Sequence, residues 1–225
     1  MKDIQLIKGS CFELNDDIAD KSIDLIVTDP PYGMSFVSSY RKVKHKAIEN
    51  DQSLVWLPEW FKSQYRVLKD NSHAYVFCSY HHIDKFISYS KEAGFEVKNV
   101  LIWHKNNTGM GDLTGDYAPQ YEFILFLSKG RKVLNGRRDS NIIKCPKTGN
   151  LNHPTEKPVN LIQFLIEKSS KPGDLVLDNF FGSGSCAIAC SNLNRKFIGH
   201  EIDEQRYNDA YKRLQLVLSQ TSLFT

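Results

Sequence analysis

Four residues that follow a short apolar run have the types and spacing to bind an amino group. The run covers residues 23–28, and Asp29, Pro30, Pro31 and Tyr32 come directly after it. Proline fixes its own φ and keeps the residue before it extended, so the Asp29 carboxylate and the Pro30 carbonyl are held as two acceptors. These acceptors suit the N–H groups of an exocyclic amine whose heterocycle stacks on Tyr32. The alternative interpretation is a strand that ends in a Pro-Pro turn with a half-buried tyrosine.

A second group of residues has the pattern of a nucleoside site. After a strand-like run, a glycine-containing turn leads into a helix, and it contains Asp178, Phe180, Gly182, Ser183, Gly184 and Ser185. Glycines let a ligand approach the backbone, and a helix N-terminus offers free N–H donors. Glu201 ends the next strand 19 positions beyond Gly182, where an acid typically binds a ribose diol. The third glycine of the dinucleotide fingerprint is absent, which favours a nucleoside without a pyrophosphate over NAD.

Between these two groups, residues 153–158 (His-Pro-Thr-Glu-Lys-Pro) precede an amphipathic run. Thr155 has the side chain of an N-cap and Pro158 suits a first helical turn, so a capped helix start is one interpretation. The other is that the Thr155 hydroxyl and Lys157 hold a carboxylate at this helix entry.

Alternating strand and helix patterns supply the elements that must position these groups. Strand patterns occur at 23–28, 74–78, 97–103, 121–127, 174–178 and 196–202. Helix patterns occur at 53–68, 82–93, 158–169, 184–194 and 203–218. This alternation predicts an α/β fold with a mostly parallel twisted sheet and helices on both faces. A chain of 225 residues with 41% hydrophobic content suits a single domain over residues 1–225.

Basic residues gather in two segments without a regular pattern, 33–52 and 129–152. The net charge is only +3, but the first segment contains Arg41, Lys42, Lys44 and Lys46. The second contains Arg131, Lys132, Arg137 and Arg138. A run of charge is usually a solvated face. Two such runs beside a base-accepting site fit contacts to phosphates.

Composition excludes several other classes of protein. The five cysteines lack CxxC spacing and the seven histidines lack metal-ligand spacing, so we expect free thiols and no metal site. No apolar run approaches the roughly 20 residues of a membrane helix, and the first residues lack the apolar core of a signal peptide. We therefore expect a cytoplasmic protein with no membrane partner.

Together these stretches resemble the DNA amino-methyltransferases that use S-adenosylmethionine, over nearly the whole chain. The order of the motifs, catalytic first and cofactor last, resembles the permuted subgroup called the β class. The resemblance implies a Rossmann-like methyltransferase fold with a circularly permuted motif order. It also implies transfer of a methyl group to a flipped adenine in DNA, because cytosine-N4 enzymes more often begin the first motif with Ser.

The resemblance also implies roles for individual residues. Asp29 and the Pro30 carbonyl would accept from the target amino group, Pro31 belongs to the same motif, and Tyr32 would stack on the base. The residues that would contact the cofactor are Ser10, Cys11, Asp29, His153, Thr155, Lys157, Asp178, Phe180, Gly182, Ser183, Gly184, Ser185 and Glu201. The chain departs from the family at Ser10, where the family usually has Asp, at Asn179, which replaces a proline, and at Ser185-Cys186, which replaces two threonines.

Alternatives remain at the level of the substrate. A cytosine-N4 or RNA adenine methyltransferase would use the same chemistry, and a catalytically silent nucleic-acid-binding module would keep the fold. A protein-glutamine methyltransferase usually has Asn in place of Asp29. By resemblance, residues 33–52 form a mobile DNA-contacting loop and 129–152 a short target-recognition segment. The resemblance implies DNA as a partner, with a second copy of the chain, since family members are often dimers, and a cognate restriction endonuclease as further candidate partners.

Overall fold

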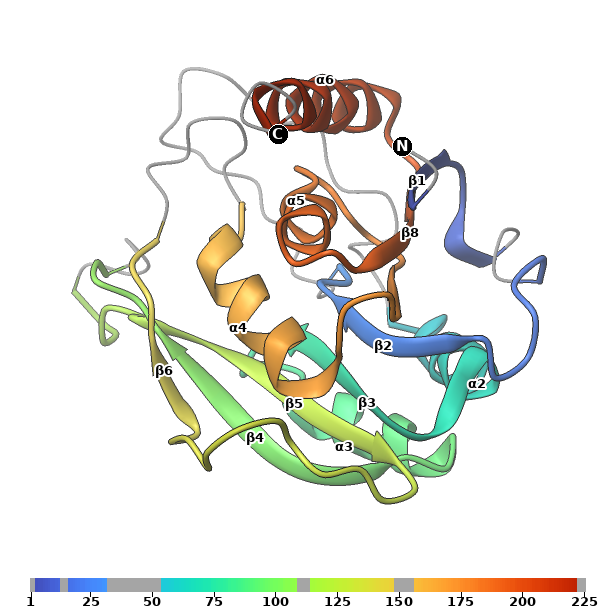
Figure 1. The fold of residues 1–225 in the computed structure, drawn as a ribbon. Helices are drawn as coiled ribbons and strands as arrows, with labels where there is room; N and C mark the ends of the chain where they lie inside the picture. Colours follow the sequence, from blue (N-terminus) through green and yellow to red (C-terminus); the bar gives the residue numbers. More distant parts are fainter. Residues whose placement is uncertain (1–2, 13–15, 32–53, 109–113, 148–155, 222–225) are drawn as a thin grey trace.

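One sheet organises the protein. The computed structural model describes residues 3–12, 16–31, 54–108, 114–147 and 156–221. Within them, eight strands form a sheet in the order β1-β8-β7-β2-β3-β5-β4-β6 (Figure 1). The strands are β1 (Ile4–Lys8), β2 (Ile23–Thr28), β3 (Leu68–Cys78), β4 (Glu96–His104), β5 (Tyr121–Lys129), β6 (Ile142–Lys144), β7 (Leu175–Asp178) and β8 (Lys196–Glu201).

The sheet is mostly parallel. All pairs from β1 through β8, β7 and β2 to β3 are parallel, and β6 is parallel to β4. Strand β5 is antiparallel to both of its neighbours, β3 and β4. Every strand except β5 therefore points the same way, which confirms the predicted fold class.

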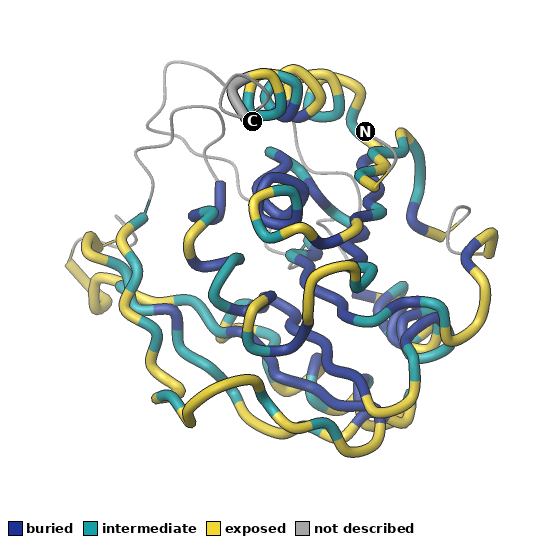
Figure 2. Tube along the Cα trace, in the orientation of Figure 1, coloured by how far each residue is buried: buried dark blue, intermediate teal, exposed yellow. Residues whose placement is uncertain are grey.

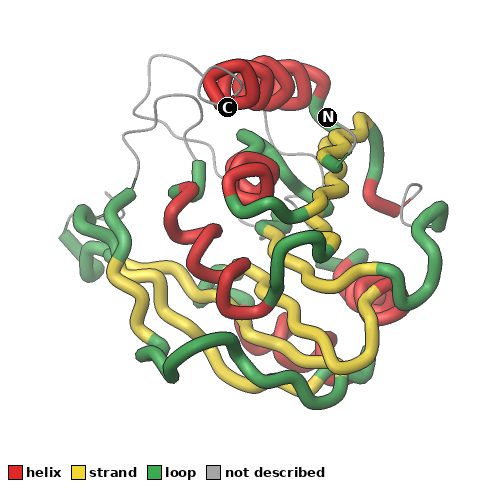
Figure 3. Tube along the Cα trace, viewed as in Figure 1, coloured by secondary structure: helices red, strands yellow, loops and turns green. Residues whose placement is uncertain are grey.

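Helices cover both faces of the sheet. The helices are α2 (Leu57–Val67), α3 (Ile83–Glu92), α4 (Val159–Ser169), α5 (Ser185–Asn192) and α6 (Glu204–Thr221). Helices α4, α5 and α6 pack on one face, and α2 and α3 on the other (Figures 1 and 3). Along β2, Leu25 and Val27 belong to the first core and Ile26 to the second. The apolar run 23–28 is therefore buried on both faces, as a central parallel strand requires (Figure 2).

The helix predictions agree with the structure to within a few residues, whereas the strand predictions missed the two outermost strands, β1 and β6. β1 is a partly exposed edge strand of five residues, of which Gln5 and Lys8 are polar, and β6 has only three residues. β3 begins at Leu68 rather than at 74. The prediction missed this first part because residues 69–73 are all polar, although only Asp70 and Asn71 are exposed. Within the segment 129–152, residues 142–144 form β6 and thus correct the expectation of a segment without regular structure. None of the helices described is long and apolar enough to cross a membrane.

The topology puts a change of direction at the centre of the sheet. From β7 the chain passes through α5 to β8 on one side, and from β2 it passes through α2 to β3 on the other. β2 and β7 are adjacent and parallel. In open α/β sheets, ligands bind outside the carboxyl ends of the strands at this kind of switch point.

Candidate functional site

The carboxyl ends of β2, β3, β7 and β8 meet at one edge of the sheet, which we call the Asp29 edge. Asp29 directly follows β2 and Asp178 ends β7, so both carboxylates lie at the switch point. The Thr28 hydroxyl donates to Asp178 Oδ1 over 2.8 Å and thus links the two strand ends. The amide of Phe180 donates to the same oxygen over 3.0 Å. Burial raises the pKa of Asp178 to about 7, and these two hydrogen bonds oppose the shift.

Lys157 is brought to Asp29 from a distant part of the sequence. Its ammonium forms an ion pair with Asp29 Oδ2 and a second one, 3.3 Å long, with Glu122 Oε2. The Lys157 side chain is only 10% exposed. Burial alone would lower the pKa of Lys157, but the carboxylates of Asp29 and Glu122 outweigh it and raise the pKa above its ordinary value. The structure therefore unites two predicted residues, one from each of two motifs.

Glu122 is a member of this site that sequence reasoning did not single out. It lies near the start of β5, and its other oxygen, Oε1, accepts a 2.6 Å hydrogen bond from Lys105 Nζ. Burial raises the pKa of Glu122, but Lys157 and Lys105 outweigh that effect and lower it. The sequence did contain a signal for Glu122, because it is a carboxylate at the second position of a mostly apolar strand. A carboxylate that is buried there must have a charged or hydrogen-bonding partner.

The turn between β7 and α5 has the geometry that the glycine pattern predicts. Gly182 and Gly184 have φ angles of 48° and 78°, and Gly184 is the N-cap of α5. The Gly184 amide donates to the Phe181 carbonyl over 2.8 Å. A Cβ on Gly184 would lie 3.1 Å from the Cβ of Ala210 in α6. Only glycine suits both the left-handed backbone and this close approach.

Glu201 lies at the tip of β8 beside this turn, as expected. Its two carboxylate oxygens accept from the amides of Gly182, over 3.0 Å, and Asp203, over 2.9 Å. Burial raises the pKa of Glu201, and the two amides oppose the shift. The carbonyl of Glu201 accepts from the Gly9 amide over 2.9 Å, which brings the residues after β1 to the same edge.

Ser10 and Cys11 follow Gly9 and lie at this edge. The Ser10 hydroxyl accepts a 3.3 Å hydrogen bond from the Phe12 amide. Cys11 is buried, and burial raises the pKa of its thiol to about 12, so it remains protonated.

An aromatic cluster adjoins Phe180. The centre of the Phe180 ring lies 5.9 Å from that of the Trp56 ring and 5.8 Å from that of the Trp60 ring. The ring centres of Phe12 and Trp56 are 6.0 Å apart. The indole N–H groups of Trp56 and Trp60 are buried without a hydrogen-bond acceptor. Only Phe180 of this cluster was predicted from the sequence.

Arg213 of α6 connects the glycine turn to the residue before Lys157. It donates to the Ser183 carbonyl over 2.9 Å and to the Ser185 hydroxyl over 3.3 Å. Its other nitrogen forms a 2.6 Å ion pair with the buried Glu156. Sequence reasoning missed this residue, because a single arginine on the amphipathic helix α6 carries no local signal.

The basic residues after β5 lie at the opposite edge of the sheet. Thr28 pairs with Val76, which pairs with Leu125, and Lys129 ends β5 four residues later. Four strand residues span roughly 13 Å away from the Asp29 edge. The structure therefore places Arg131, Lys132, Arg137 and Arg138 at the far edge and does not bring them to Asp29.

Two contacts tie this basic segment to the far edge. The Lys168 ammonium, at the end of α4, donates to the Arg137 carbonyl over 2.6 Å. The Arg131 amide donates to Asn71 Oδ1, near the start of β3, over 3.0 Å. The remaining predicted residues, Tyr32, Arg41, Lys42, Lys44, Lys46, His153 and Thr155, lie outside the described part of the chain.

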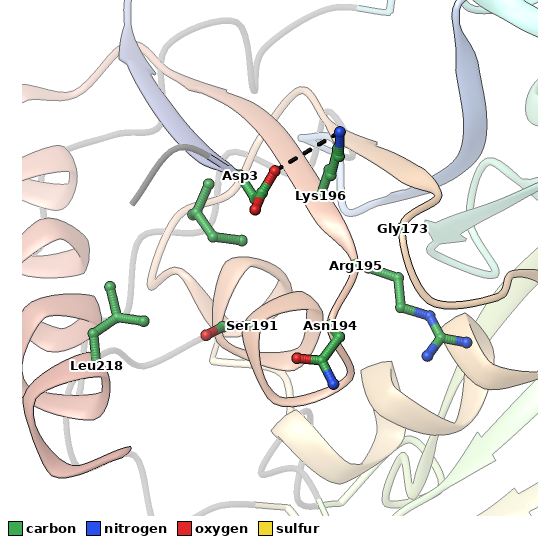
Figure 4. Close-up of a pocket in the computed structure, with 8 residues that line it drawn as sticks. Asp3, Gly173, Ser191, Asn194, Arg195, Lys196 and Leu218 are labelled. Atoms are coloured by element: carbon green, nitrogen blue, oxygen red, sulfur yellow. Dashed lines mark ion pairs between the residues drawn. The ribbon is translucent and has the colours of Figure 1, made fainter. Parts of the chain in front are cut away.

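A cavity of about 250 Å³ also lies away from Asp29, next to the starts of β1 and β8 (Figure 4). Its charged side chains are already paired. Asp3 and Lys196 form an ion pair at 3.8 Å, and the Arg195 guanidinium donates to the Ser170 and Leu193 carbonyls. The Asp29 edge is therefore the better candidate site.

Comparisons with known proteins agree with this geometry. A sequence model of the N6/N4 methyltransferases, described as DNA methylases, matches residues 23–212. YubD of Escherichia coli (strain K12), whose name marks it as a methylase candidate, is 33% identical over 213 residues, which are 95% of this chain and 91% of that protein. The Type II methyltransferase M2.MboI of Moraxella bovis is 28% identical over 242 residues, covering 92% of this chain and 89% of that protein.

Solved structures share the fold. The crystal structure of the M1.HpyAVI–SAM complex has a TM-score of 0.75 and 30% sequence identity, and covers 94% of this chain and 98% of that chain. The cytosine-N4-specific PvuII DNA methyltransferase has a TM-score of 0.78 at 19% identity, covering 94% and 86%. At that identity the likeness concerns the fold alone. The family model and the relatives together show that the chain belongs to the DNA methylases that modify the N6 or N4 amino group of a base.

Proposed function

We propose that this protein transfers a methyl group from S-adenosylmethionine to the N6 amino group of an adenine in DNA. The observation that carries the proposal is the position of Asp29, a carboxylate paired with Lys157 at the switch point of the sheet. Adenine is preferred to cytosine because the motif begins with Asp, as in the adenine enzymes that the chain resembles. The names of M2.MboI and of the M1.HpyAVI–SAM complex support a Type II methyltransferase that uses this cofactor.

The residues at the Asp29 edge fit the proposed cofactor. Gly182 and Gly184 add no side chains at two positions of the turn before α5, and the N-terminus of α5 is adjacent. Glu201 would hold the ribose diol, and the ring of Phe180 with the unpaired Trp56 indole N–H would adjoin the adenine moiety. When bound, S-adenosylmethionine supplies an activated methyl group, so no covalent enzyme intermediate is needed.

Asp29 would act on the amino group of the flipped base. The nitrogen lone pair of an aromatic amine is delocalised into the ring, which makes it a poor nucleophile. Hydrogen bonds to Asp29 and to the Pro30 carbonyl draw the nitrogen toward tetrahedral geometry and localise the lone pair. Alignment of the two reactants supplies much of the remaining acceleration. Flipping costs a few kcal/mol, which stacking on Tyr32 would offset.

DNA contacts are proposed for segments that begin at the Asp29 edge. Residues 33–52, with their basic cluster, follow Tyr32 directly, two positions after Pro31. Strand β6 runs parallel to β4, so its last residue, Lys144, lies on the side of the Asp29 edge. Within the second basic segment, residues 142–152 are therefore the part that we propose for target recognition. Arg131, Lys132, Arg137 and Arg138 are proposed to contact DNA only where a bound duplex extends to the far edge.

A methyl-transfer assay tests the proposal. Purified protein, tritiated S-adenosylmethionine and unmethylated DNA should yield labelled DNA, and mass spectrometry of the nucleosides should show N6-methyladenine. Asp29→Ala should lower the rate about a hundredfold to a thousandfold, as removal of one hydrogen-bonding group that stabilises the transition state does, while the cofactor still binds. A labelled cytosine or labelled RNA would identify the alternative substrates. Wild-type-like transfer by Asp29→Ala, or none by the wild type, would refute the proposal.

The proposal includes two partners other than DNA, namely a second copy of the chain and a restriction endonuclease. A homodimer would be seen by light scattering of the purified protein. A cognate restriction endonuclease, and hence a cytoplasmic location with the cellular DNA, is proposed from the Type II name of M2.MboI. Digestion of unmethylated DNA by an extract of the source cells, and protection by this protein, would test the pairing.

A further inference from the structure

Four charged side chains form a continuous chain that starts at Asp29, and we call it the charge chain. Its members are Asp29, Lys157, Glu122 and Lys105. The Lys157 ammonium contacts both Asp29 and Glu122, the second at 3.3 Å, and Lys105 closes the chain on Glu122 at 2.6 Å. Carboxylates and ammonium groups alternate, so the four formal charges cancel.

Aromatic side chains shield the charge chain from water. The Lys157 ammonium lies 5.1 Å from the centre of the Phe77 ring, and the Lys105 ammonium lies 5.0 Å from the centre of the Trp103 ring. Glu122 is on the same strand face as Ile124, which belongs to the core under α4. In such a partly dry environment, each charge depends strongly on its neighbours.

The geometry divides one ammonium between two carboxylates. Glu122 takes part of the Lys157 charge that would otherwise fall entirely on Asp29. Lys105 in turn neutralises part of the charge on Glu122 through Oε1. It therefore limits how strongly Glu122 attracts the Lys157 ammonium away from Asp29. Lys157 and Glu122 are both charged at neutral pH, because each shifts the pKa of the other toward the ionised form.

We infer that Glu122 is a positioning residue for methyl transfer, which acts through Lys157 to keep the Asp29 carboxylate an effective acceptor. The inference rests on the proposed role of Asp29. An acceptor fully paired with an ammonium would attract the amino hydrogens of a base weakly. An acceptor with no ammonium partner would be free to turn away from the site.

The charge chain makes opposite predictions for its two outer members. Without the charge of Glu122, the Lys157 ammonium is no longer shared between Glu122 and Asp29, and protonation of Asp29 requires a lower pH. Without the charge of Lys105, Glu122 acts more strongly, and protonation of Asp29 begins at a higher pH. Among the described residues, Asp178 of β7 and Cys78 of β3 also act on Asp29, and both stay in place in the two variants.

Glu122→Gln and Lys105→Met test the inference, with Glu96→Gln as the matched control. Glu96 is also a strand glutamate paired with a lysine, Lys98 at 2.7 Å, but it is exposed and lies at the far edge. For each variant, kcat, the KM for DNA and the Kd for S-adenosylmethionine would be measured from pH 5 to 9. The Asp29 carboxyl would also be titrated by NMR with 13C-labelled aspartate, assigned with Asp29→Asn.

We expect Glu122→Gln to lower kcat about tenfold or more, with KM and Kd within threefold of wild type. The acidic limb of its pH–rate profile and the NMR midpoint of Asp29 should move down by roughly 0.5–1 pH unit. Both should move up in Lys105→Met and stay in place in Glu96→Gln. An active wild type with an unchanged kcat or midpoint in Glu122→Gln, or shifts of the same sign in the two variants, would overturn this inference. An inactive wild type would refute the proposed function instead, and the NMR titration would still decide the coupling.

Discussion

Removal of the Lys157 ammonium should destabilise the fold as well as stop the reaction. The variant Lys157→Met keeps most of the apolar stem over Phe77 but leaves the carboxylates of Asp29 and Glu122 beside each other without the shared cation. Two like charges in a partly buried site repel each other, and neither is compensated by water to the extent that an exposed carboxylate would be.

The magnitude follows from the burial of the three side chains. Loss of one partner from a buried ion pair costs about 3–5 kcal/mol. The side chains of Asp29 and Glu122 are each 25% exposed, so water relieves part of this cost, and we expect about 3 kcal/mol. For a chain of this size, that free energy corresponds to a decrease in Tm of roughly 6–12 °C.

Urea unfolding at pH 7.5 measures the effect. The control is Lys62→Met, which breaks the Lys62–Glu59 pair, also short at 2.7 Å but with side chains that are 59% and 71% exposed. Such a pair contributes at most about 0.5 kcal/mol. In the double variant Lys157→Met/Glu122→Gln, one uncompensated charge is gone, so about half of the lost stability should return.

The pH dependence has a defined sign. The pKa of Glu122 is lowered in the folded state, so its contribution is present above the ordinary value of 4.5 and is lost as the pH falls. The difference in stability between wild type and Lys157→Met should therefore shrink below about pH 4.5. A Lys157→Met variant no less stable than Lys62→Met at pH 7.5, or a difference that grows on acidification, would refute the reasoning.

Three further measurements test other parts of the structure. Gly184→Ala should lower the free energy of unfolding by about 1–3 kcal/mol, because φ is 78° and the new Cβ would lie 3.1 Å from Ala210; equal stability in urea would contradict the backbone conformation. Burial lowers the pKa of His200 from 6.5 to about 4, so the unfolded chain binds a proton that the folded chain does not, and stability should fall between pH 6.5 and 4 by up to about 1.4 kcal/mol per unit. A His200→Asn variant with the same acid dependence as wild type would contradict this. If the basic residues of 41–46 neutralise most of about five phosphates, log affinity for DNA should fall against log salt with a slope near −4.5. Alanine at their positions should flatten the slope, whereas alanine at the basic positions of 131–138 should change it by less than about one.

The fold class could be predicted from the sequence because the central elements carry their own signals. β2 is buried on both faces, so its residues 25–27 are all apolar, and a period of 3.6 marks the helices that cover the sheet. The edge strands β1 and β6 carry no such signal. Their outer faces meet water and their pairing depends on partners nearly 200 and 40 residues away, Phe197 for Ile4 and Ile102 for Ile142.

The same distinction divides the candidate site. Asp29, Gly182, Gly184 and Glu201 were predicted because each lies at the end of a strand or in the turn that leads into a helix, and local geometry limits the residue types at such positions. Glu122 was missed because its importance lies in a contact with a lysine 35 positions away in the sequence, and neither residue marks the other.

The sequence alone thus determined the chemistry that this chain offers, namely acceptors after β2 and a glycine turn before α5, because those features depend on neighbouring residues. Only the tertiary structure decided which charges act together. It paired Lys157 with Asp29 and Glu122, and it put Arg131 through Arg138 at the far edge because β5 runs antiparallel to its neighbours. Charge interactions depend on distance and burial, and both are set by the packing of segments that are remote in the sequence.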